Sequence, residues 1–199
     1  VLGITGLIGK TVFDQLSLNK SINVYGTLRT ALVKNKQLRY LNYEFNEKFL
    51  SELISEVKPN YVINCIGITK HLIDSKDPLK AIPVNSLLPI ELSSICSEEG
   101  CKLIQISTDC VFSGTKGSYV ETDKPDTDEL YGITKLLGEI NTPECITIRM
   151  SIIGHELVAR RGLLNWFLDQ KKEIEGYKNA IFSGLMPSEM QKRLPHNLN

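Results

Sequence analysis

Val1-Leu2-Gly3-Ile4-Thr5-Gly6-Leu7-Ile8-Gly9 opens the chain with an apolar segment and three glycines at the spacing G-x-x-G-x-x-G. Glycines at a strand-to-helix junction allow a sharp turn, a close approach of the backbone to a pyrophosphate, and tight packing of helix on strand. The apolar spacing over 7–18 predicts a helix whose first N–H groups face the phosphates. The turn therefore predicts a dinucleotide site, and the residues assigned to it are Gly3, Thr5, Gly6, Leu7, Ile8 and Gly9.

Two alternatives to this site use the same residues. A tight turn without a ligand needs the same glycines, but their position at the first strand–helix junction favours a ligand site. Gly9-Lys10-Thr11 resembles the end of a phosphate-binding P-loop. That motif requires a glycine five residues before Gly9, and Ile4 stands there, so we exclude the P-loop.

The end of the second apolar run bears on the choice of cofactor. It reads Tyr25-Gly26-Thr27-Leu28-Arg29, where an NAD site usually has an acid for the ribose 2′-hydroxyl. No acid occurs from residue 22 to residue 41. Arg29 suits a 2′-phosphate, and Thr27 can hydrogen-bond the ribose or the phosphate. The segment predicts NADPH in preference to NADH, with a solvated loop charge as the alternative for Arg29.

Short apolar runs alternate with helical patterns along the chain. We expect strands at 1–4, 22–28, 61–66, 102–106 and 145–150. We expect helices at 7–18, 49–57, 87–96 and 130–140. This alternation predicts βαβ units in an α/β, Rossmann-type doubly wound parallel sheet over residues 1–150.

The pattern changes after Met150. We expect a short apolar helix at 163–168 and a strand at 180–182, within a short, incomplete C-terminal substrate-binding segment over 151–190. Residues 191–199 are polar and aperiodic, which predicts a disordered tail. The chain also starts inside a strand, so we expect a methionine and a few residues to be missing at that end.

The composition narrows the class of protein. The chain has 199 residues, 42% of them hydrophobic and 23% charged, with a formal net charge of zero. These values predict one globular α/β unit and argue against a nucleic-acid partner or a polybasic membrane patch. Because no apolar run approaches the roughly 20 residues of a membrane span and no signal peptide opens the chain, we expect no membrane association.

The five cysteines are Cys65, Cys96, Cys101, Cys110 and Cys145. Their number is odd, they form no C-x-x-C pair, and no cysteine–histidine cluster has zinc spacing. We therefore predict no metal and no disulfide, and a reducing, cytoplasmic setting.

Hydroxyl residues end the expected strand at 102–106, where Ser107, Thr108 and Asp109 follow it. Ligands bind at the carboxyl edge of open parallel sheets. Downstream, Tyr131 and Lys135 stand at i and i+4, on one face of a helix. An ordinary solvated helix carries such a pair too. The order of glycine triad, strand-end hydroxyls and tyrosine–lysine pair is what indicates catalysis.

Ketone reduction explains why these residue types belong together. It needs a hydride on carbon and a proton on oxygen. A tyrosine with a pKa near ~10 acts poorly at neutral pH unless its anion is stabilised. The Lys135 cation one turn away would lower the pKa of Tyr131 and can also hydrogen-bond a nicotinamide ribose. The Thr108 hydroxyl can hold the substrate carbonyl.

Three segments resemble the dTDP-4-dehydrorhamnose reductase family of the extended short-chain dehydrogenase/reductase superfamily. They are Ser107-Thr108-Asp109-Cys110-Val111-Phe112-Ser113-Gly114, then Gly117-Ser118-Tyr119-Val120-Glu121, then Leu130-Tyr131-Gly132-Ile133-Thr134-Lys135-Leu136-Leu137-Gly138-Glu139. The patterns S-T-D-x-V-F-x-G and Y-G-x-x-K-x-x-G-E are specific to that family, and the resemblance extends to about Met190.

The resemblance implies an NADPH-dependent reduction of a nucleoside-diphosphate-linked 4-keto-6-deoxy sugar, supplying deoxysugars for surface polysaccharide. It implies a nucleotide-sugar substrate and allows a homodimer. It assigns the proton donor to Tyr131, its partner to Lys135 and the carbonyl-binding hydroxyl to Thr108, a role that Ser107 can share. It adds to the cofactor site Asn64, Cys65, Ile66, Gly67, Ser107, Tyr131 and Lys135. It places at the substrate Thr108, Asp109, Val111, Phe112 and Met150. Asn85 matches a helix asparagine that supports the active site.

Length is the main departure from the family, whose members continue beyond this chain with more substrate domain. We therefore expect a chain truncated at both ends. Two other functions stay open. One is a nucleotide-sugar epimerase or dehydratase with tightly held NAD, which the missing acid after the second strand disfavours. The other is a non-catalytic regulatory subunit, like that of methionine adenosyltransferase, which the intact set of Thr108, Tyr131 and Lys135 disfavours.

Overall fold

The computed structural model describes residues 1–28, 38–40, 47–70, 72–155, 162–187 and 189. Its α-helices are α1 (Leu7–Ser17), α2 (Glu47–Val57), α3 (Pro78–Ile82), α4 (Leu88–Glu98), α5 (Leu130–Leu137) and α6 (Leu163–Leu168). Its strands are β1 (Gly26–Leu28), β2 (Leu38–Tyr40), β3 (Tyr61–Asn64), β4 (Lys102–Ser107) and β5 (Cys145–Arg149). Three single turns complete the description: the 3-10 turns η1 (Ile73–Lys76) and η3 (Asp109–Val111) and the π-turn η2 (Pro83–Leu87).

The N-terminal segment 1–4 joins two sets of parallel strands, β1–β2 and β3–β4–β5, into one sheet. On one side, the N–H of Leu2 donates to Ile63 O at 2.8 Å and the N–H of Cys65 donates to Leu2 O at 3.1 Å. On the other side, the N–H of Thr27 donates to Val1 O and the N–H of Ile4 donates to Thr27 O, both at 3.0 Å. The spatial order is therefore β2, β1, segment 1–4, β3, β4, β5.

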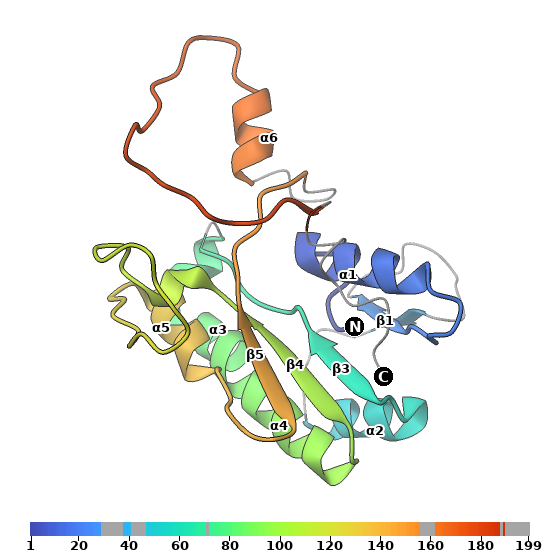
Figure 1. Ribbon diagram of the computed structural model, residues 1–199. Coiled ribbons are helices and arrows are strands. Elements are labelled where there is room, and N and C mark those ends of the chain that lie inside the picture. The colour runs from blue at the N-terminus through green and yellow to red at the C-terminus, as the bar shows by residue number, and fades with distance from the viewer. Residues whose placement is uncertain (29–37, 41–46, 71, 156–161, 188, 190–199) are drawn as a thin grey trace.

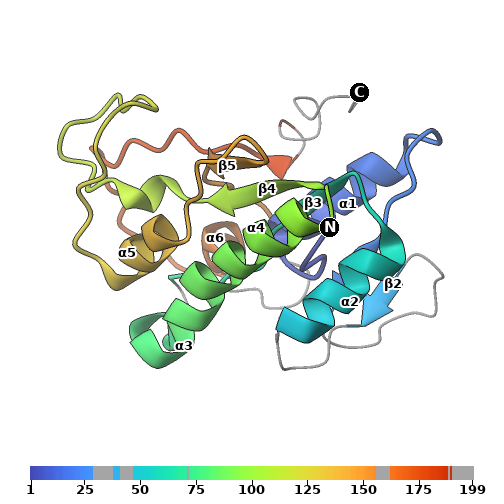
Figure 2. The ribbon, with the colours of Figure 1, turned by 90° about the horizontal axis from the view of Figure 1, so that it is seen from below.

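This order is that of a dinucleotide-binding Rossmann sheet, in which the first strand lies at the centre and the chain winds outward in both directions. Helices cover both faces (Figures 1 and 2). The predicted α/β, doubly wound parallel fold is confirmed.

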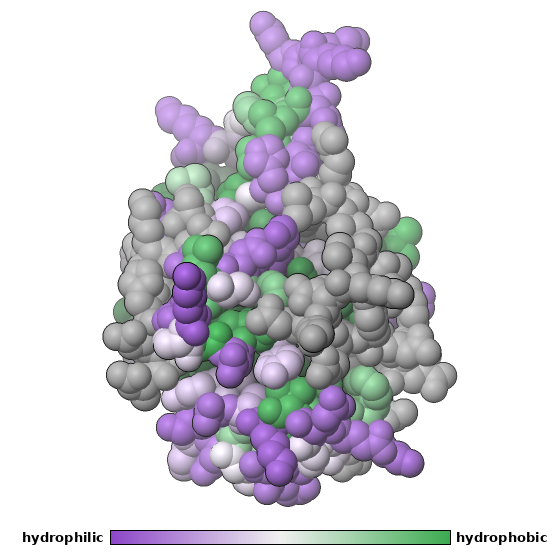
Figure 3. Space-filling view, turned by 90° about the vertical axis from the view of Figure 1, so that its right-hand side faces the viewer, coloured by the Kyte–Doolittle hydropathy of each residue, from purple (hydrophilic) through white to green (hydrophobic). Residues whose placement is uncertain are grey.

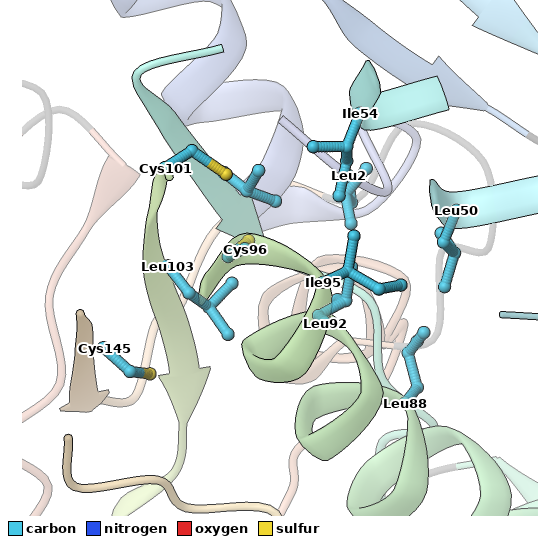
Figure 4. Close-up of a cluster of buried hydrophobic side chains, with 11 residues drawn as sticks. Leu2, Leu50, Ile54, Leu88, Leu92, Ile95, Cys96, Cys101, Leu103 and Cys145 are labelled. Atoms are coloured by element: carbon cyan, nitrogen blue, oxygen red, sulfur yellow. The ribbon is translucent and has the colours of Figure 1, made fainter. Parts of the chain in front are cut away.

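Alternation along the strands divides the core between the two faces. Val62 and Leu103 point toward α2 and α4, where they join a cluster that includes Leu50, Leu88 and Leu92 (Figure 4). Their neighbours Ile63 and Ile104 point the other way, toward α1. The cluster on that side is built on Val12, Leu16, Val24 and Ile63. Alternate strand residues thus pack against helices on opposite faces of the sheet. This packing fixes the position of the sheet edge where the site lies.

Several predicted elements agree with the structure and some do not. The helix at 163–168 agrees in both bounds. The strand expected at 22–28 is confined to β1, because Ile22 belongs to a turn in which its N–H donates to Asn19 O. The strand expected at 180–182 is wrong: Ile181 is 95% exposed, and it is Leu185 that bridges to Ile152.

The helical region before α4 was not predicted in full. Pro78 opens α3 and Pro83 opens η2, so this region is helical well before residue 87. Proline suits the first turn of a helix, where its missing N–H costs nothing, and here it starts new turns.

The C-terminal part leaves the body of the molecule after β5. Helix α6 and the strand-less segment that follows it form an arm that projects from the sheet (Figure 1). Among the described residues, no helix combines the length and apolar character needed to cross a membrane.

Candidate active site

The glycine turn brings α1 into close contact with the first strand. Gly3 adopts a φ of +81°, in the left-handed region that favours glycine. A Cβ on Gly9 would lie 2.3 Å from Gly3 O, so no side chain fits there. Gly6 is exposed and caps α1, and the first i→i−4 bond runs from Lys10 N to Gly6 O. The earlier N–H groups of the helix have no intrahelical acceptor and are available to an anion.

Thr27, assigned to the ribose or phosphate, lies buried beneath this turn. Its Oγ1 accepts a hydrogen bond from the N–H of Gly3 at 3.0 Å. The structure thus gives Thr27 a role in shaping the glycine turn. Arg29 lies outside the described residues, so its predicted contact with a 2′-phosphate stays a prediction.

The segment after β3 runs from the glycine turn to Lys135. The Asn64 side chain is completely buried; its Nδ2 donates to Gln105 Oε1 at 2.8 Å and its Oδ1 accepts from the N–H of Ile66 at 3.1 Å. Asn64 therefore shapes this segment from within. Cys65 Cβ lies 3.2 Å from where a Cβ on Gly9 would stand. Burial raises the pKa of the Cys65 thiol to about 12.

Gly67 stands between two polar groups of the site. A Cβ at Gly67 would lie 3.3 Å from Asn85 Oδ1 and 3.7 Å from Lys135 Nζ. Residues 65–67 therefore bridge the predicted pyrophosphate site and the predicted catalytic lysine. A cofactor bound along this edge would pass from one to the other.

Lys135 reaches the sheet from α5. Only 6% of the residue is exposed, and its Nζ donates to Ile106 O at 2.6 Å. Burial lowers the pKa of Lys135 to about 8, while electrostatic interactions with Cys65 and Glu139 act in the opposite direction. The cation is thus retained at neutral pH by a bond to the backbone and by nearby negative charge.

Tyr131 lies one turn before Lys135 on the same helix. Burial raises the pKa of Tyr131 to about 12, and a hydrogen bond with the Thr108 hydroxyl acts to lower it. We expected Lys135 to lower the pKa of Tyr131. In the structure, burial dominates, and the lysine ammonium bonds to the Ile106 carbonyl. Tyr131 therefore carries its proton at neutral pH and is suited to donate it.

Thr108 and Asp109 form the turn that leaves β4. Thr108 is buried and caps η3, with its Oγ1 accepting from the N–H of Cys110 at 3.1 Å. Asp109 Oδ1 accepts from Ser151 Oγ at 2.7 Å. The turn is thus tied to the end of β5, and the Thr108 hydroxyl lies next to Tyr131.

Two glycines of the Y-G-x-x-K-x-x-G-E pattern allow α5 to approach its neighbours. A Cβ on Gly132 would lie 2.2 Å from Cys110 O, and one on Gly138 would lie 2.1 Å from Asn85 O. Asn85, in η2, accepts from the N–H of Ile68 at 2.9 Å and donates to Thr134 Oγ1 at 3.2 Å. These contacts fix the helix that carries Tyr131 and Lys135.

The remaining assigned residues lie around the same edge with different surroundings. Ser107 is buried and donates to Glu139 Oε1 at 2.7 Å, which gives it a structural partner. Phe112 stacks on Tyr119, with ring centroids 4.3 Å apart. Met150 packs against the cluster beneath α1.

Val111 lies in η3, the turn that leaves β4. Its side chain is completely buried, and its carbonyl accepts from the N–H groups of Asp126 and Thr127 at 3.2 Å. The side chain thus supports the loop from within, and the assignment of Val111 to the substrate stays a prediction.

The sequence patterns assigned no role to Glu139 or Arg149. Arg149 Nε and a terminal guanidinium nitrogen both donate to the Glu139 carboxylate, at 2.9 and 2.7 Å. The two residues come from different elements, so no local spacing connects them. The glutamate that closes the Y-G-x-x-K-x-x-G-E pattern was the available signal.

A Rossmann sheet, a glycine turn at its first strand, and a threonine, tyrosine and lysine at its carboxyl edge define the extended short-chain dehydrogenase/reductase class. Within this class the particular family is shown by a family model. The chain belongs to the family of the RmlD substrate binding domain, whose model matches residues 1–173.

Curated relatives of this chain include proteins of two kinds. The mouse (Mus musculus) methionine adenosyltransferase 2 subunit beta is 31% identical over 139 residues, which are 70% of this chain and 40% of that protein. The probable low-salt glycan biosynthesis reductase Agl14 of Haloferax volcanii is 35% identical over 108 residues, 51% of this chain and 36% of that protein. The chain thus spans about two fifths of the length of the curated relatives it matches.

Solved structures support the fold. A hypothetical dTDP-4-dehydrorhamnose reductase from Sulfolobus tokodaii has a TM-score of 0.64 at 25% identity, covering 76% of this chain and 55% of that one. The dTDP-4-dehydrorhamnose reductase of Bacillus anthracis in complex with NADP has a TM-score of 0.57 at 21% identity, covering 76% and 52%. The Bordetella bronchiseptica enzyme WbmG with NAD and UDP has a TM-score of 0.64 at 19% identity, covering 78% and 54%.

Proposed function

We propose that this chain carries the cofactor-binding and proton-transfer part of an NADPH-dependent reductase of a nucleotide-linked 4-keto-6-deoxy sugar. The observation that carries the proposal is the convergence of Thr108, Tyr131 and Lys135 at the carboxyl edge of the sheet, beside the glycine turn. Residues 1–150 would form the nucleotide-binding domain and residues 151–190 part of the sugar-nucleotide segment.

The cofactor site of this proposal rests on the space around the glycine turn. No side chain fits at Gly9, and Gly3 has a backbone conformation that favours glycine. The backbone itself therefore forms the surface next to the N-terminal end of α1. The pyrophosphate would bind there, and Cys65, Ile66 and Gly67 would line the path toward Lys135. The NADP-bound relative from Bacillus anthracis and the predicted role of Arg29 favour NADPH, and the NAD-bound WbmG keeps NADH as the alternative.

In this proposal the nicotinamide would supply the hydride for the keto carbon. Tyr131, protonated at neutral pH, would donate its proton to the keto oxygen. The Thr108 hydroxyl would donate a hydrogen bond to the same oxygen and hold it next to Tyr131. Lys135 would stabilise the tyrosinate that forms, because its cation lies one helical turn away and its desolvated setting strengthens the attraction.

The substrate would bind beyond Thr108. Asp109, Phe112 and Met150 lie on the strand ends and the loop at this edge, and we propose that they surround the sugar. A substrate with a nucleoside diphosphate part is favoured because WbmG was solved with UDP, and a glycan pathway because the relative Agl14 is named a probable glycan biosynthesis reductase.

Calorimetric titration of the chain with NADPH, and with NADH alongside, tests the proposal. We expect binding of NADPH with a smaller dissociation constant than that of NADH. Turnover is then assayed by the loss of NADPH absorbance with nucleotide-linked keto sugars. Absence of binding by either nucleotide to a folded chain would refute the proposed cofactor site.

A second candidate function is favoured by the relatives. The 31% identity with methionine adenosyltransferase 2 subunit beta over 70% of this chain supports a regulatory subunit of the same fold. Such a subunit needs no proton donor, so it would tolerate Tyr131→Phe without loss of its effect on a partner enzyme. A reductase would lose its turnover with the same substitution. A sugar epimerase or dehydratase would instead retain NAD through purification, which extraction and absorbance would reveal.

A further inference from the structure

The carboxylate of Glu139 ties the end of α5 to two strands. Its Oε1 accepts from Ser107 Oγ at 2.7 Å and from Arg149 Nε at 2.9 Å, and its Oε2 accepts from an Arg149 terminal nitrogen at 2.7 Å. Ser107 and Arg149 stand opposite each other in the register of β4 and β5. Side chains of Glu139 and Arg149 are only 13% and 24% exposed. A carboxylate held by three donors at one site has little freedom to move.

Strand β4 provides a hydrogen-bond partner for Glu139 and another for Lys135. Lys135 Nζ donates to Ile106 O, and the next residue along β4 is Ser107, which donates to Glu139. Lys135 stands in the last turn of α5, and Glu139 follows the end of this helix by two residues. Adjacent residues of one strand therefore fix the cation and the anion.

Besides burial, the main influences on the pKa of Lys135 come from Cys65 and Glu139. Cys65 follows β3 directly, and Glu139 stands two residues after the end of α5. Burial holds the pKa of the Cys65 thiol near 12, so this thiol is uncharged at neutral pH. The Glu139 carboxylate is thus the negative charge that opposes the cost of burying the Lys135 ammonium.

We propose that Glu139 is a positioning residue that acts through Lys135: its carboxylate, fixed by Ser107 and Arg149, keeps the Lys135 amine charged and aimed at the sheet edge. The consequence for catalysis rests on the function proposed above, because a charged Lys135 is what the Tyr131 anion would need. The effect on Lys135 itself is independent of any substrate or cofactor.

A role in packing alone would give a different result from this electrostatic role. Glu139→Gln removes the negative charge and leaves the Arg149 cation uncompensated. Arg149→Met removes the positive charge, leaves the carboxylate in place and keeps an apolar side chain against the Phe112 ring, over which the guanidinium lies at 5.1 Å. If Glu139 acts by charge, the two substitutions shift the protonation of Lys135 in opposite directions. If it acts by packing, both loosen the site in the same direction.

The experiment follows the Lys135 amine by NMR in the cofactor-free 199-residue chain with isotopically labelled lysine, assigned through Lys135→Met. We expect Glu139→Gln to lower the pKa of Lys135 by about one unit and Arg149→Met to raise it. Glu139→Asp, which keeps the charge, should stay near the wild type. Shifts of the Lys135 pKa with the same sign in Glu139→Gln and Arg149→Met, or no shift in either variant, would overturn the proposal.

Thermal melting of each variant identifies those that fold. If Glu139→Gln does not fold, Arg149→Met decides: a raised pKa of Lys135 supports the proposal, and an unchanged or lowered pKa overturns it. NADPH titration over pH separates this inference from the proposed function. If the wild type binds no NADPH, the proposed function fails while the lysine titration still decides the role of Glu139. If it binds, the affinity of Glu139→Gln should decline at a lower pH than that of the wild type.

Discussion

Lys135 buries a cationic side chain almost completely, and its environment offsets that cost with a backbone carbonyl and a carboxylate. Nζ donates to Ile106 O at 2.6 Å, and Gly67 leaves the space beside it. A Cβ at position 67 would crowd Asn85 Oδ1 at 3.3 Å and lie in ordinary contact with Lys135 Nζ at 3.7 Å. At the scale of the residue, the site is thus a buried cation whose ammonium group is held by a backbone carbonyl.

A first prediction concerns the pH dependence of stability. The pKa of Lys135 is lowered by burial to about 8 from its ordinary value of 10.5. Between these values the unfolded chain binds more protons at this residue, so its contribution to stability rises with pH. The unfolding free energy of the wild type relative to Lys135→Met should increase by about 3 kcal/mol from pH 7.5 to 10.5. Denaturant titrations across this range measure it, and a flat difference would contradict it.

A second prediction concerns proton donation. Tyr131→Phe removes the phenol while preserving the ring, so NADPH affinity should stay within about twofold and keto-sugar turnover should fall by about 10²–10⁴-fold. The measurement needs a form of the chain with measurable turnover. Tyr119→Phe is the matched control, because Tyr119 stacks on Phe112 at the exposed loop. Equal loss of turnover in both variants would remove Tyr131 from the mechanism.

Sequence spacing located the Tyr131 and Lys135 pair because both residues lie on one helix. It did not find the partners of the hydroxyl residues. Thr27 bonds to Gly3, 24 residues away, and Ser107 to Glu139, 32 residues away. A hydroxyl that looks free in a linear pattern can be occupied by such a distant partner. Thr27 and Ser107, which the sequence assigns to the cofactor, each have such a bond within the protein.

At the scale of elements, α5 owes its position to glycine. Gly138 has a φ of −91°, which any residue can adopt. Glycine is therefore required at this position only because there is no room for a side chain. A Cβ there would lie 2.1 Å from Asn85 O, in the π-turn that also binds Thr134. The turn and the helix are therefore fitted to each other through backbone contact.

A third prediction tests that contact. Gly138→Ala should reduce the unfolding free energy by about 2–3 kcal/mol, because helix and turn must separate to admit a methyl group. Gly176→Ala is the control: a Cβ there meets nothing within 4 Å, and its φ is not positive, so the change should stay within about 0.5 kcal/mol. Similar effects at both positions would contradict the space argument.

The sequence predicted helices and strands best where an apolar period was uninterrupted, as in α2, β4 and α6. It failed at 180–182, where three apolar or small residues suggested a strand, because Ile181 is exposed there and Leu185 makes the bridge to Ile152. It also missed the helical turns at 78–87, because two prolines interrupt the pattern there. Prolines that begin a turn and prolines that end one look alike in a linear sequence.

At the scale of the molecule, the C-terminal arm contrasts with the well-packed sheet. Exposed apolar side chains gather along it: Leu163, Trp166, Phe167, Leu168, Tyr177, Ile181 and Phe182. Figure 3 shows such side chains in green on the part that projects from the body. Exposed apolar side chains gathered on one part of a molecule promote association.

A fourth prediction follows for the arm. The double substitution Phe167→Ser and Ile181→Ser should reduce concentration-dependent self-association, measured by sedimentation velocity, and leave the melting temperature within about 2 °C. Leu18→Ser is the control, since Leu18 is also exposed but lies at the end of α1, outside the arm. An equal reduction by the control would show that the arm is not the associating surface.

The placement of segment 1–4 at the centre of the sheet has a consequence for the order of assembly. Leu2 pairs with Asn64, which stands 62 residues later in the sequence, and in the described part of the chain segment 1–4 joins β1 to β3. Such pairing between distant positions raises contact order and slows folding. Because segment 1–4 is synthesised before β3, its apolar residues stay unpaired on that side until β3 has left the ribosome, and a chaperone can protect them during this interval.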